Sequence, residues 1–433
     1  MNIAYILPEF VTEKESGGLA TYYDNISRLL ADAGHIIMIF VQSDTTETLN
    51  YYPGVTVERV HIDLQQINPD IPGSFIRSWS EGLKTALCQK LESGMRFDLV
   101  QYPNFMGYGI DRVDIPTVIR VSSYRPLLRA ADKEIFDIHG EYLSIKAPDF
   151  IEDIAVMKAD AVYSPSVSAA AYVKQQTGKK VRIIESPYYP RSNSQYELEK
   201  NKAWIKEKKY AITFGTLKVL KGAKLIGDSI YEILEECPDL YWVFAGAEAD
   251  WMDEKGQKVS PSQYIKKQAK QYSDRLLFLG KLRQEELFAY VKGASFCVMP
   301  SRVDNLPNTC IEAMALGKVV IGTEGASFEQ LLENGKSGFL IERENREMLV
   351  ETVCKAYGLS KQHANDMGMK AQERLQKMSP DVILEELVDF YNSVIEGTAN
   401  IADRQNSFYD KTIAQYNRIL KQCGIEEAQK YLL

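Results

Sequence analysis

Residues 294–317 constrain the fold of this chain more than any other stretch. They begin with an apolar run, Ala294-Ser295-Phe296-Cys297-Val298-Met299, that ends at Pro300. A continuous apolar run of this kind is typical of a strand buried on both faces, as in a parallel sheet covered by helices. After a polar loop, a helix is predicted from Pro307 to Gly317, because proline suits the first helical position and glycine the position after the last. A buried strand that leads into a helix indicates an α/β fold.

The start of this predicted helix is suited to bind an anion. The N–H groups of Asn308 and Thr309 would have no partner within the helix and would point outward, where a phosphate can accept from them. Two carboxylates flank this position, Asp304 in the loop and Glu312 in the helix. The arrangement predicts a ligand with a phosphate between two hydroxyl-bearing rings.

The first half of the chain alternates strands and helices in the same way. A strand at 3–7, a helix at 19–33 that Gly34 ends, and a strand at 35–41 form a βαβ unit. A helix is also predicted from Pro148 to Lys158, because proline suits a first turn. Further strands are predicted at 55–61, 98–102, 117–121, 161–163 and 181–184.

Two adjacent glycines, Gly17 and Gly18, stand after Ser16 in the loop before the first helix. The loop is not the G-x-G-x-x-G fingerprint of dinucleotide-binding folds. Adjacent glycines at a helix start nevertheless allow a ligand to approach the backbone closely. A plain turn is the alternative, because loops before helices often contain glycine.

A second α/β series follows a predicted linker at 188–209. Its loop at 215–222 carries Lys218 and Lys221, which are candidates for phosphate binding. The strands of this series are predicted at 211–214, 240–244, 275–279 and 319–321, and its helices at 224–235 and 285–292. The fold class predicted is α/β, with two Rossmann-like doubly wound domains, residues 1–190 and residues 205–378.

Residues 379–433 are predicted to form C-terminal helices that cross back to the first domain. An apolar stripe marks the first of these helices, and a second amphipathic segment runs from about Gln405 to the C-terminus. A partner-binding role for these helices is the alternative to packing within the monomer. The stripe consists of Val382, Leu384, Leu387, Val388 and Tyr391.

Composition limits the classes of function. Lys and Arg number 51 against 59 Asp and Glu, a net charge of −8, which argues against a nucleic-acid binder. The six cysteines contain no C-x-x-C pair, so neither a zinc site nor a disulfide framework is predicted, and the thiols are expected to be reduced. No signal peptide and no stretch approaching the ~18 apolar residues of a membrane span is found. We therefore predict a cytoplasmic protein, with peripheral membrane contact left open.

The chain resembles the retaining glycosyltransferases of family 4 (glycosyltransferase group 1), which have the GT-B fold. The resemblance extends to about residue 395 and is strongest over 275–340. It implies two Rossmann-like domains that face across a closing cleft, with the nucleotide-sugar donor mainly on the second and the acceptor on the first. The matching motifs, in family order, are Phe278-Leu279-Gly280, Glu285-Glu286-Leu287, Pro300-Ser301, Asp304 and Glu312 with seven residues between them, Glu312-Ala313-Met314-Ala315-Leu316-Gly317, and Asn334-Gly335-Lys336-Ser337-Gly338-Phe339-Leu340.

The resemblance also implies roles for single residues. Glu312 would bind the ribose hydroxyls, and Asp304 would hold the donor sugar where the family usually has glutamate. The N–H groups of Asn308 and Thr309 would hold the diphosphate. Lys221 would neutralise the charge that develops on the leaving phosphate.

Other binding residues follow from the same resemblance. Gly17 and Gly18 would approach the same diphosphate from the first domain, and the backbone near Leu282 would meet the base. Pro307 lacks an N–H that the family often offers to the sugar, so Asn305 is a candidate to replace it, and Leu306 beside it is included among the binding residues.

The sequence departs from the family at two charged positions. The family has an arginine directly after the glycine that corresponds to Gly215. This chain has Thr216 at that position, and Lys218 is a candidate to supply the missing positive charge. The histidine common after the 117–121 strand is Ser122, so Arg120 and Arg125 are candidates for ligand contact or for a structural role.

Together these features predict a retaining, metal-independent glycosyltransferase of the hexosyltransferase type. A nucleotide-sugar, with a UDP-sugar favoured, is the donor substrate, and no other cofactor is expected. The acceptor is an unidentified sugar, lipid-linked or protein hydroxyl, and the oligomeric state is open. Two alternatives stay open: a glycosyltransferase-like binding or scaffolding subunit, inactive because of Thr216 and Ser122, and a sugar-nucleotide epimerase of the same fold.

Overall fold

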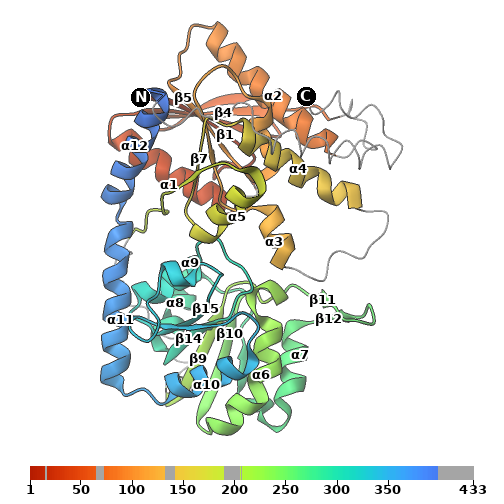
Figure 1. The fold of residues 1–433 in the computed structure, drawn as a ribbon, viewed down its shortest axis with the longest axis vertical. Coiled ribbons are helices and arrows are strands. Elements are labelled where there is room, and N and C mark those ends of the chain that lie inside the picture. The colour runs from red at the N-terminus through yellow and green to blue at the C-terminus, as the bar shows by residue number, and fades with distance from the viewer. Residues whose placement is uncertain (15–16, 65–72, 132–141, 190–204, 206, 398–433) are drawn as a thin grey trace. The chain divides into compact units, whose positions relative to one another are not determined.

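A computed structural model describes residues 1–14, 17–64, 73–131, 142–189, 205 and 207–397 of the chain (Figure 1). The chain divides into two compact units. Unit 1 comprises Met1–Pro187 together with the helix α12 (Pro380–Ile395), and unit 2 comprises Tyr188–Ser379. The predicted amphipathic segment from Gln405 onward, most of the predicted linker, and Ser16 lie outside the described residues. Among the described residues, the structure contains no helix with the length and apolar character that crossing a membrane requires.

Unit 1 is built on an eight-stranded sheet in the order β3-β4-β2-β1-β5-β6-β7-β8. Its strands are β1 (Asn2–Leu7), β2 (Ile36–Ser43), β3 (Glu47–Tyr52), β4 (Val55–His61), β5 (Leu99–Pro103), β6 (Thr117–Arg120), β7 (Ala161–Ser164) and β8 (Val181–Ile183). All neighbours are parallel except β3 and β4. The order reverses direction between β1 and β5, the kind of switch point at which open α/β sheets bind ligands.

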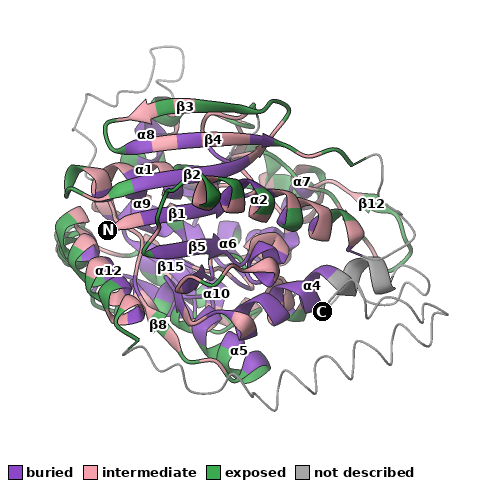
Figure 2. Ribbon diagram, turned by 90° about the horizontal axis from the view of Figure 1, so that it is seen from above, coloured by how far each residue is buried: buried purple, intermediate pink, exposed green. Residues whose placement is uncertain are grey.

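The strands predicted for this half are confirmed, but the edge strand β3 was missed. Figure 2 shows β3 at the edge of the sheet next to β4, without a buried residue, and the more buried strands β2, β1 and β5 lie beyond β4. Its sequence, ETLNYY, is mainly polar and gives no apolar run, since an edge strand pairs on one side only.

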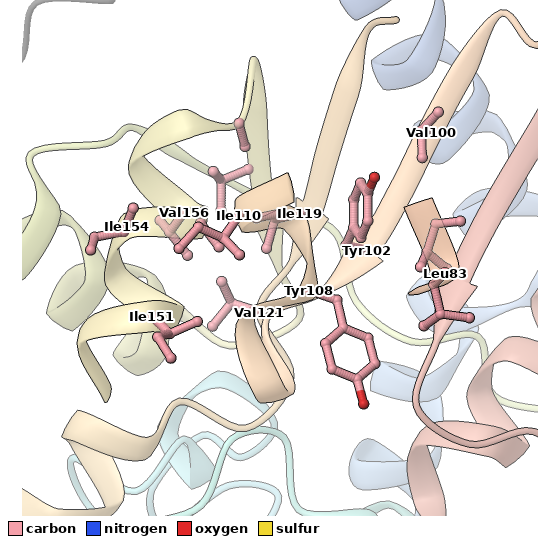
Figure 3. Packing of buried hydrophobic residues seen from close by; sticks show 14 of the residues in the cluster. Leu83, Val100, Tyr102, Tyr108, Ile110, Ile119, Val121, Ile151, Ile154 and Val156 are labelled. Atoms are coloured by element: carbon pink, nitrogen blue, oxygen red, sulfur yellow. The ribbon is translucent and has the colours of Figure 1, made fainter. Parts of the chain in front are cut away.

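Helices cover both faces of this sheet. They are α1 (Gly18–Asp32), α2 (Ser74–Glu92), α3 (Arg125–Ala131), α4 (Tyr142–Lys158), α5 (Val167–Thr177) and the 3-10 helix η1 (Phe105–Asp111). One core lies under α2, α4, α5 and η1 (Figure 3), and a second lies under α1 and α12.

The predicted start of α4 is wrong. Pro148 lies inside α4 rather than in its first turn. A proline there removes one helical hydrogen bond and costs about 3 kcal/mol. Packing of the residues that follow offsets this cost, because Ile151, Ile154 and Val156 are fully buried in the core (Figure 3).

The predicted apolar stripe of α12 is partly wrong. Val382 is exposed, and the buried face consists of Ile383, Leu387, Tyr391 and Val394. The Tyr391 hydroxyl donates to Oε1 of Gln101 in β5 at 2.6 Å. The orientation of α12 is therefore set by its tertiary contacts within unit 1.

Unit 2 contains a six-stranded, fully parallel sheet in the order β13-β10-β9-β14-β15-β16. Its strands are β9 (Lys209–Phe214), β10 (Leu240–Ala245), β13 (Leu276–Phe278), β14 (Phe296–Met299), β15 (Val320–Thr323) and β16 (Phe339–Ile341), with a separate hairpin of β11 (Trp251–Met252) and β12 (Lys258–Val259). The strands predicted for this half are confirmed, and β14 is fully buried as expected. The order reverses direction between β9 and β14, so the loops after these two strands meet at the switch point.

Both faces of this sheet are also covered. One face carries α8 (Gln284–Gly293), α9 (Asn308–Ala315) and α11 (Lys361–Leu375), and the other carries α6 (Ala223–Glu236), α7 (Pro261–Ala269) and α10 (Arg346–Tyr357). The remaining 3-10 turns are η3 (Val219–Lys221), η4 (Lys270–Arg275), η5 (Phe328–Gln330) and η6 (Gln376–Met378). The prediction of an α/β protein with two doubly wound sheets is confirmed.

Two thiols of unit 2 are close enough to be cross-linked. The Sγ atoms of Cys237, at the end of α6, and Cys354, in α10, lie 3.6 Å apart. A disulfide has its sulfurs about 2.05 Å apart, so a small movement of the two side chains is enough to form one. Hydrogen peroxide is therefore expected to oxidise the two thiols to a disulfide, and it is itself reduced to water. Peptide mass spectrometry without reductant checks this result.

The rate and the controls of this oxidation follow from the surroundings of the thiols. Burial raises the pKa of both Cys237 and Cys354, so less thiolate is present near neutral pH and the reaction should accelerate as pH rises. Cys354→Ser must abolish the cross-link, and the buried Cys310 must stay unmodified. Recovery of both thiols unlinked after prolonged oxidation at alkaline pH would contradict the expectation.

Candidate functional site

The candidate site lies at the carboxyl edge of the sheet in unit 2, where the loops after β9 and β14 meet. Gly222 has φ +83 and packs against Pro300: a Cβ added to it would lie 2.2 Å from the Pro300 carbonyl oxygen. The N–H of Arg302 donates to the carbonyl oxygen of Leu220 at 2.9 Å. The turn that carries Lys221 is therefore fixed against the loop after β14.

The helix α9 begins at Asn308, one residue later than predicted. Pro307 is the residue before the helix, with φ −69 and ψ 103, and its carbonyl accepts from the N–H groups of Cys310 and Ile311. Because proline fixes only φ, it also suits this extended position. Gly317, with φ +66, ends the helix as predicted.

The first two amides of α9 are available to a ligand. In the described part of the chain, the N–H groups of Asn308 and Thr309 have no acceptor; Asn308 is exposed and Thr309 is half-buried. A Cβ added to Gly215, directly after β9, would lie 3.3 Å from Cγ2 of Thr309. The end of β9 and the start of α9 are thus in contact, with the exposed Thr216 and the half-buried Lys218 in the same loop.

Lys221 and Asp304 form a direct ion pair between Nζ and Oδ2. The Asp304 side chain is 15% exposed and the Lys221 side chain 37%. The N–H of Asn305 donates to the other carboxylate oxygen at 3.1 Å. Sequence reasoning gave these two residues separate roles, and the structure brings them together.

The remaining predicted binding residues of unit 2 differ in how accessible they are to a ligand. Glu312 is half-buried in α9, between the buried Ile311 and Ala313. Leu306 is buried and packs in the core, so only its backbone can meet a ligand. Leu282 is half-buried and packs against the same core.

Sequence reasoning missed a set of loop contacts that hold Asp304 in place. Ser327, with φ +65, donates its hydroxyl to the carbonyl oxygen of Asp304 at 3.1 Å. Arg302 pairs with Glu344 after β16, with 2.7 Å between Nη2 and Oε1. No local pattern predicts these contacts, because they join loops that are distant in sequence and a non-glycine residue with positive φ carries no sequence signal.

In unit 1, a carboxylate of the chain itself occupies the glycine loop. The N–H groups of Gly17 and Ala20 each donate to Oε1 of Glu9 at 3.2 Å. A Cβ added to Gly18 would meet no atom within 4 Å. A phosphate would therefore have to displace Glu9 to reach the amide of Gly17.

The two candidate arginines of unit 1 have different surroundings. Arg125 pairs with the fully buried Glu152, with 3.3 Å between Nε and Oε1, and burial raises the pKa of Glu152 to about 8. The N–H of Ser122, at the position where histidine was expected, donates to Oδ1 of Asn104 at 2.9 Å. Arg120 is buried beneath the ring of Tyr22, with 3.5 Å between the guanidinium carbon and the ring centroid.

Comparison with known proteins identifies relatives of the chain. Residues 194–374 match the family model described as glycosyl transferases group 1. The lipopolysaccharide core biosynthesis mannosyltransferase LpsB of Rhizobium meliloti (strain 1021) is 24% identical over 203 residues, which cover 46% of this chain and 56% of LpsB. The match thus spans little more than half the length of this relative.

Solved structures resemble most of the chain. Sucrose-phosphate synthase from Thermosynechococcus elongatus has a TM-score of 0.68 and 17% identity, covering 91% of this chain and 99% of its own. Anabaena HepE in complex with UDP has a TM-score of 0.62 and 15% identity, covering 91% and 100%. The catalytic domain of Arabidopsis thaliana starch synthase IV, bound to ADP and acarbose, has a TM-score of 0.64 and 14% identity, covering 91% and 99%. The chain has the GT-B fold, as predicted, and its residues 194–374 are similar to the glycosyl transferases of group 1.

Proposed function

We propose that this protein is a retaining, metal-independent glycosyltransferase that moves a hexose from a nucleotide-sugar, with a UDP-sugar favoured, to an acceptor hydroxyl. The observation that carries the proposal is the convergence of the Asn308 and Thr309 amides with Lys221 and Asp304 at the switch point of unit 2. These groups can bind a diphosphate and a sugar next to each other. Two similar structures contain a nucleoside diphosphate, UDP in HepE and ADP in starch synthase IV, which supports this class of donor.

Each group has a part in the proposed reaction. The diphosphate accepts from the first amides of α9, where the helix dipole favours negative charge. Glu312 accepts hydrogen bonds from the ribose, and Asp304 accepts from hydroxyls of the donor sugar. As the bond between the anomeric carbon and the phosphate oxygen breaks, Lys221 stabilises the charge left on the diphosphate.

The acceptor side of the proposal depends on the family resemblance. Unit 1 would bind the acceptor, which is a sugar, a lipid-linked or a protein hydroxyl. The donor phosphate would assist removal of the acceptor proton, which is the course proposed for retention of configuration. Cytoplasmic location stays a prediction.

Incubation of the full chain with UDP-, GDP- and ADP-sugars tests the proposed function. We expect slow release of free nucleotide from one donor. Glu312→Ala should reduce this release about 10- to 100-fold, since a hydrogen bond to a charged group contributes about 1.5–3 kcal/mol. Glu285→Ala, which removes an exposed glutamate from α8, is the matched control and should leave the rate unchanged.

Two outcomes would redirect the proposal. Binding of a nucleotide-sugar without turnover, even with candidate acceptors, would favour the binding or scaffolding subunit. Conversion of the donor while the nucleotide stays attached, or release of a glycal, would favour the epimerase.

A further inference from the structure

Arg120 is the last residue of β6, at the carboxyl edge of the sheet in unit 1. It is only 4% exposed. Its Nη2 donates to the Ser186 hydroxyl at 2.9 Å, its guanidinium lies under the ring of Tyr22, and its Nε is buried without a hydrogen-bond partner. Arg120 therefore uses only part of its capacity to donate hydrogen bonds.

No carboxylate compensates this buried charge. Within the described residues, no Asp or Glu lies within ion-pair distance of Arg120. Two part-buried arginines of unit 1 are paired with carboxylates: Arg112 with Asp160 at 2.9 Å and Arg125 with Glu152 at 3.3 Å. A buried charge without a partner is unfavourable and uncommon, so this exception requires an explanation.

The surrounding tyrosines do not supply the missing negative charge. Tyr5, Tyr23 and Tyr163 are fully buried close to Arg120. Burial raises the pKa of all three phenols above the usual range, in spite of the opposing effect of the Arg120 charge. They stay neutral near physiological pH, so in the part of unit 1 that the structure describes they leave the charge of Arg120 uncompensated.

We propose that Arg120 binds an acidic group, a phosphate or a carboxylate, of the acceptor substrate. The proposal rests on the proposed function, in which unit 1 binds the acceptor. The guanidinium fork matches both groups, and it lies at the edge of a parallel sheet where α/β folds bind ligands. Tyr22 and Ser186, which cover it, are only half-buried, so a shift of the Tyr22 ring gives an anion access. An anion bound there neutralises the buried charge.

Binding of simple probes to the full chain tests this site. We expect either glucose 6-phosphate or glucuronate, but not glucose, to bind the wild type in isothermal titration calorimetry. Arg120→Met should weaken this binding about tenfold or more, since hydrogen bonds between charged groups are the strong ones. Arg182→Met is the matched control, because Arg182 is exposed in β8 and its loss changes the net charge equally.

A stability measurement separates loss of binding from misfolding. Arg120→Met should melt at the same or a higher temperature than the wild type without ligand, since an apolar side chain replaces an uncompensated buried charge. Arg120→Lys should keep part of the anion affinity. A folded Arg120→Met that binds the acidic probes as tightly as the wild type, or a wild type that binds neither, would overturn the proposal.

The affinity for the donor nucleotide must be measured in the same variants. UDP affinity should be unchanged in Arg120→Met, and a parallel loss of UDP binding would assign Arg120 to the donor and overturn the acceptor assignment. If the wild type binds an acidic sugar but no nucleotide-sugar, the proposed function fails while the anion site stands. Glucose 6-phosphate and glucuronate distinguish a phosphate from a carboxylate as the group recognised.

Discussion

Lys221→Ala is expected to lower kcat for cleavage of the nucleotide-sugar about 100- to 1000-fold. Removing one preformed group that stabilises developing negative charge has an effect of this size in other enzymes. Lys221 is held where this charge would appear, because its turn is fixed against the loop after β14 and its Nζ reaches Asp304. Single-turnover measurement of nucleotide release checks the change in rate.

Lys224→Ala is the matched control for this variant. Lys224 lies in the first turn of α6 and pairs with Asp228 at 2.8 Å, but both side chains are at least 31% exposed. Loss of such a surface pair changes stability by less than about 1 kcal/mol and should leave the rate unchanged.

A double-mutant cycle distinguishes two roles for Lys221. If Lys221 only holds Asp304, the double variant with Asp304→Ala will be no slower than Asp304→Ala alone. If Lys221 also acts on the diphosphate, the double variant will be slower, and Lys221→Ala will bind UDP more weakly while Asp304→Ala will not. Wild-type rates in Lys221→Ala would remove Lys221 from the mechanism.

Gly222→Ala is expected to lower the free energy of unfolding of unit 2 by about 3 kcal/mol or more. The left-handed backbone conformation costs an alanine about 1–2 kcal/mol, and overpacking against Pro300 adds to this cost. The added Cβ would lie 2.2 Å from the carbonyl oxygen of Pro300, so one of the two loops must move. Because Lys221 is the neighbouring residue, the variant should also lose activity. Urea unfolding and nucleotide release measure the two effects.

Gly256→Ala separates backbone strain from the contact with Pro300. Gly256 has φ +71, and a Cβ added to it would meet no atom within 4 Å. Only the strain of about 1–2 kcal/mol is expected there. If Gly222→Ala and Gly256→Ala lost the same free energy of unfolding, the contact with Pro300 would contribute nothing to the effect.

The sequence predicted the fold well, because continuous apolar runs and helix-ending glycines are local signals. The run at 294–299 became the buried strand β14, and Gly317 ended α9. Prediction failed where tertiary contacts override local preference. Pro148 was expected at a helix start but lies inside α4, and Val382 was expected to be buried but is exposed.

For the candidate site, the sequence determined which chemical groups are present and which local structure presents them. The strand–loop–helix pattern of residues 294–317 was sufficient to predict two free amides at the start of a helix, with a carboxylate on either side. Such features depend on backbone hydrogen bonding over a few residues, which the local sequence largely decides.

Only the tertiary structure decided how distant groups are paired. Lys221 and Asp304, 83 residues apart, form an ion pair because β9 and β14 are neighbours at the switch point of the sheet. Arg125 has a carboxylate partner, whereas Arg120, five residues earlier, has none among the residues that the structure describes. Charge compensation depends on which side chains the packed sheet brings within a few ångströms, and that is a property of the folded chain.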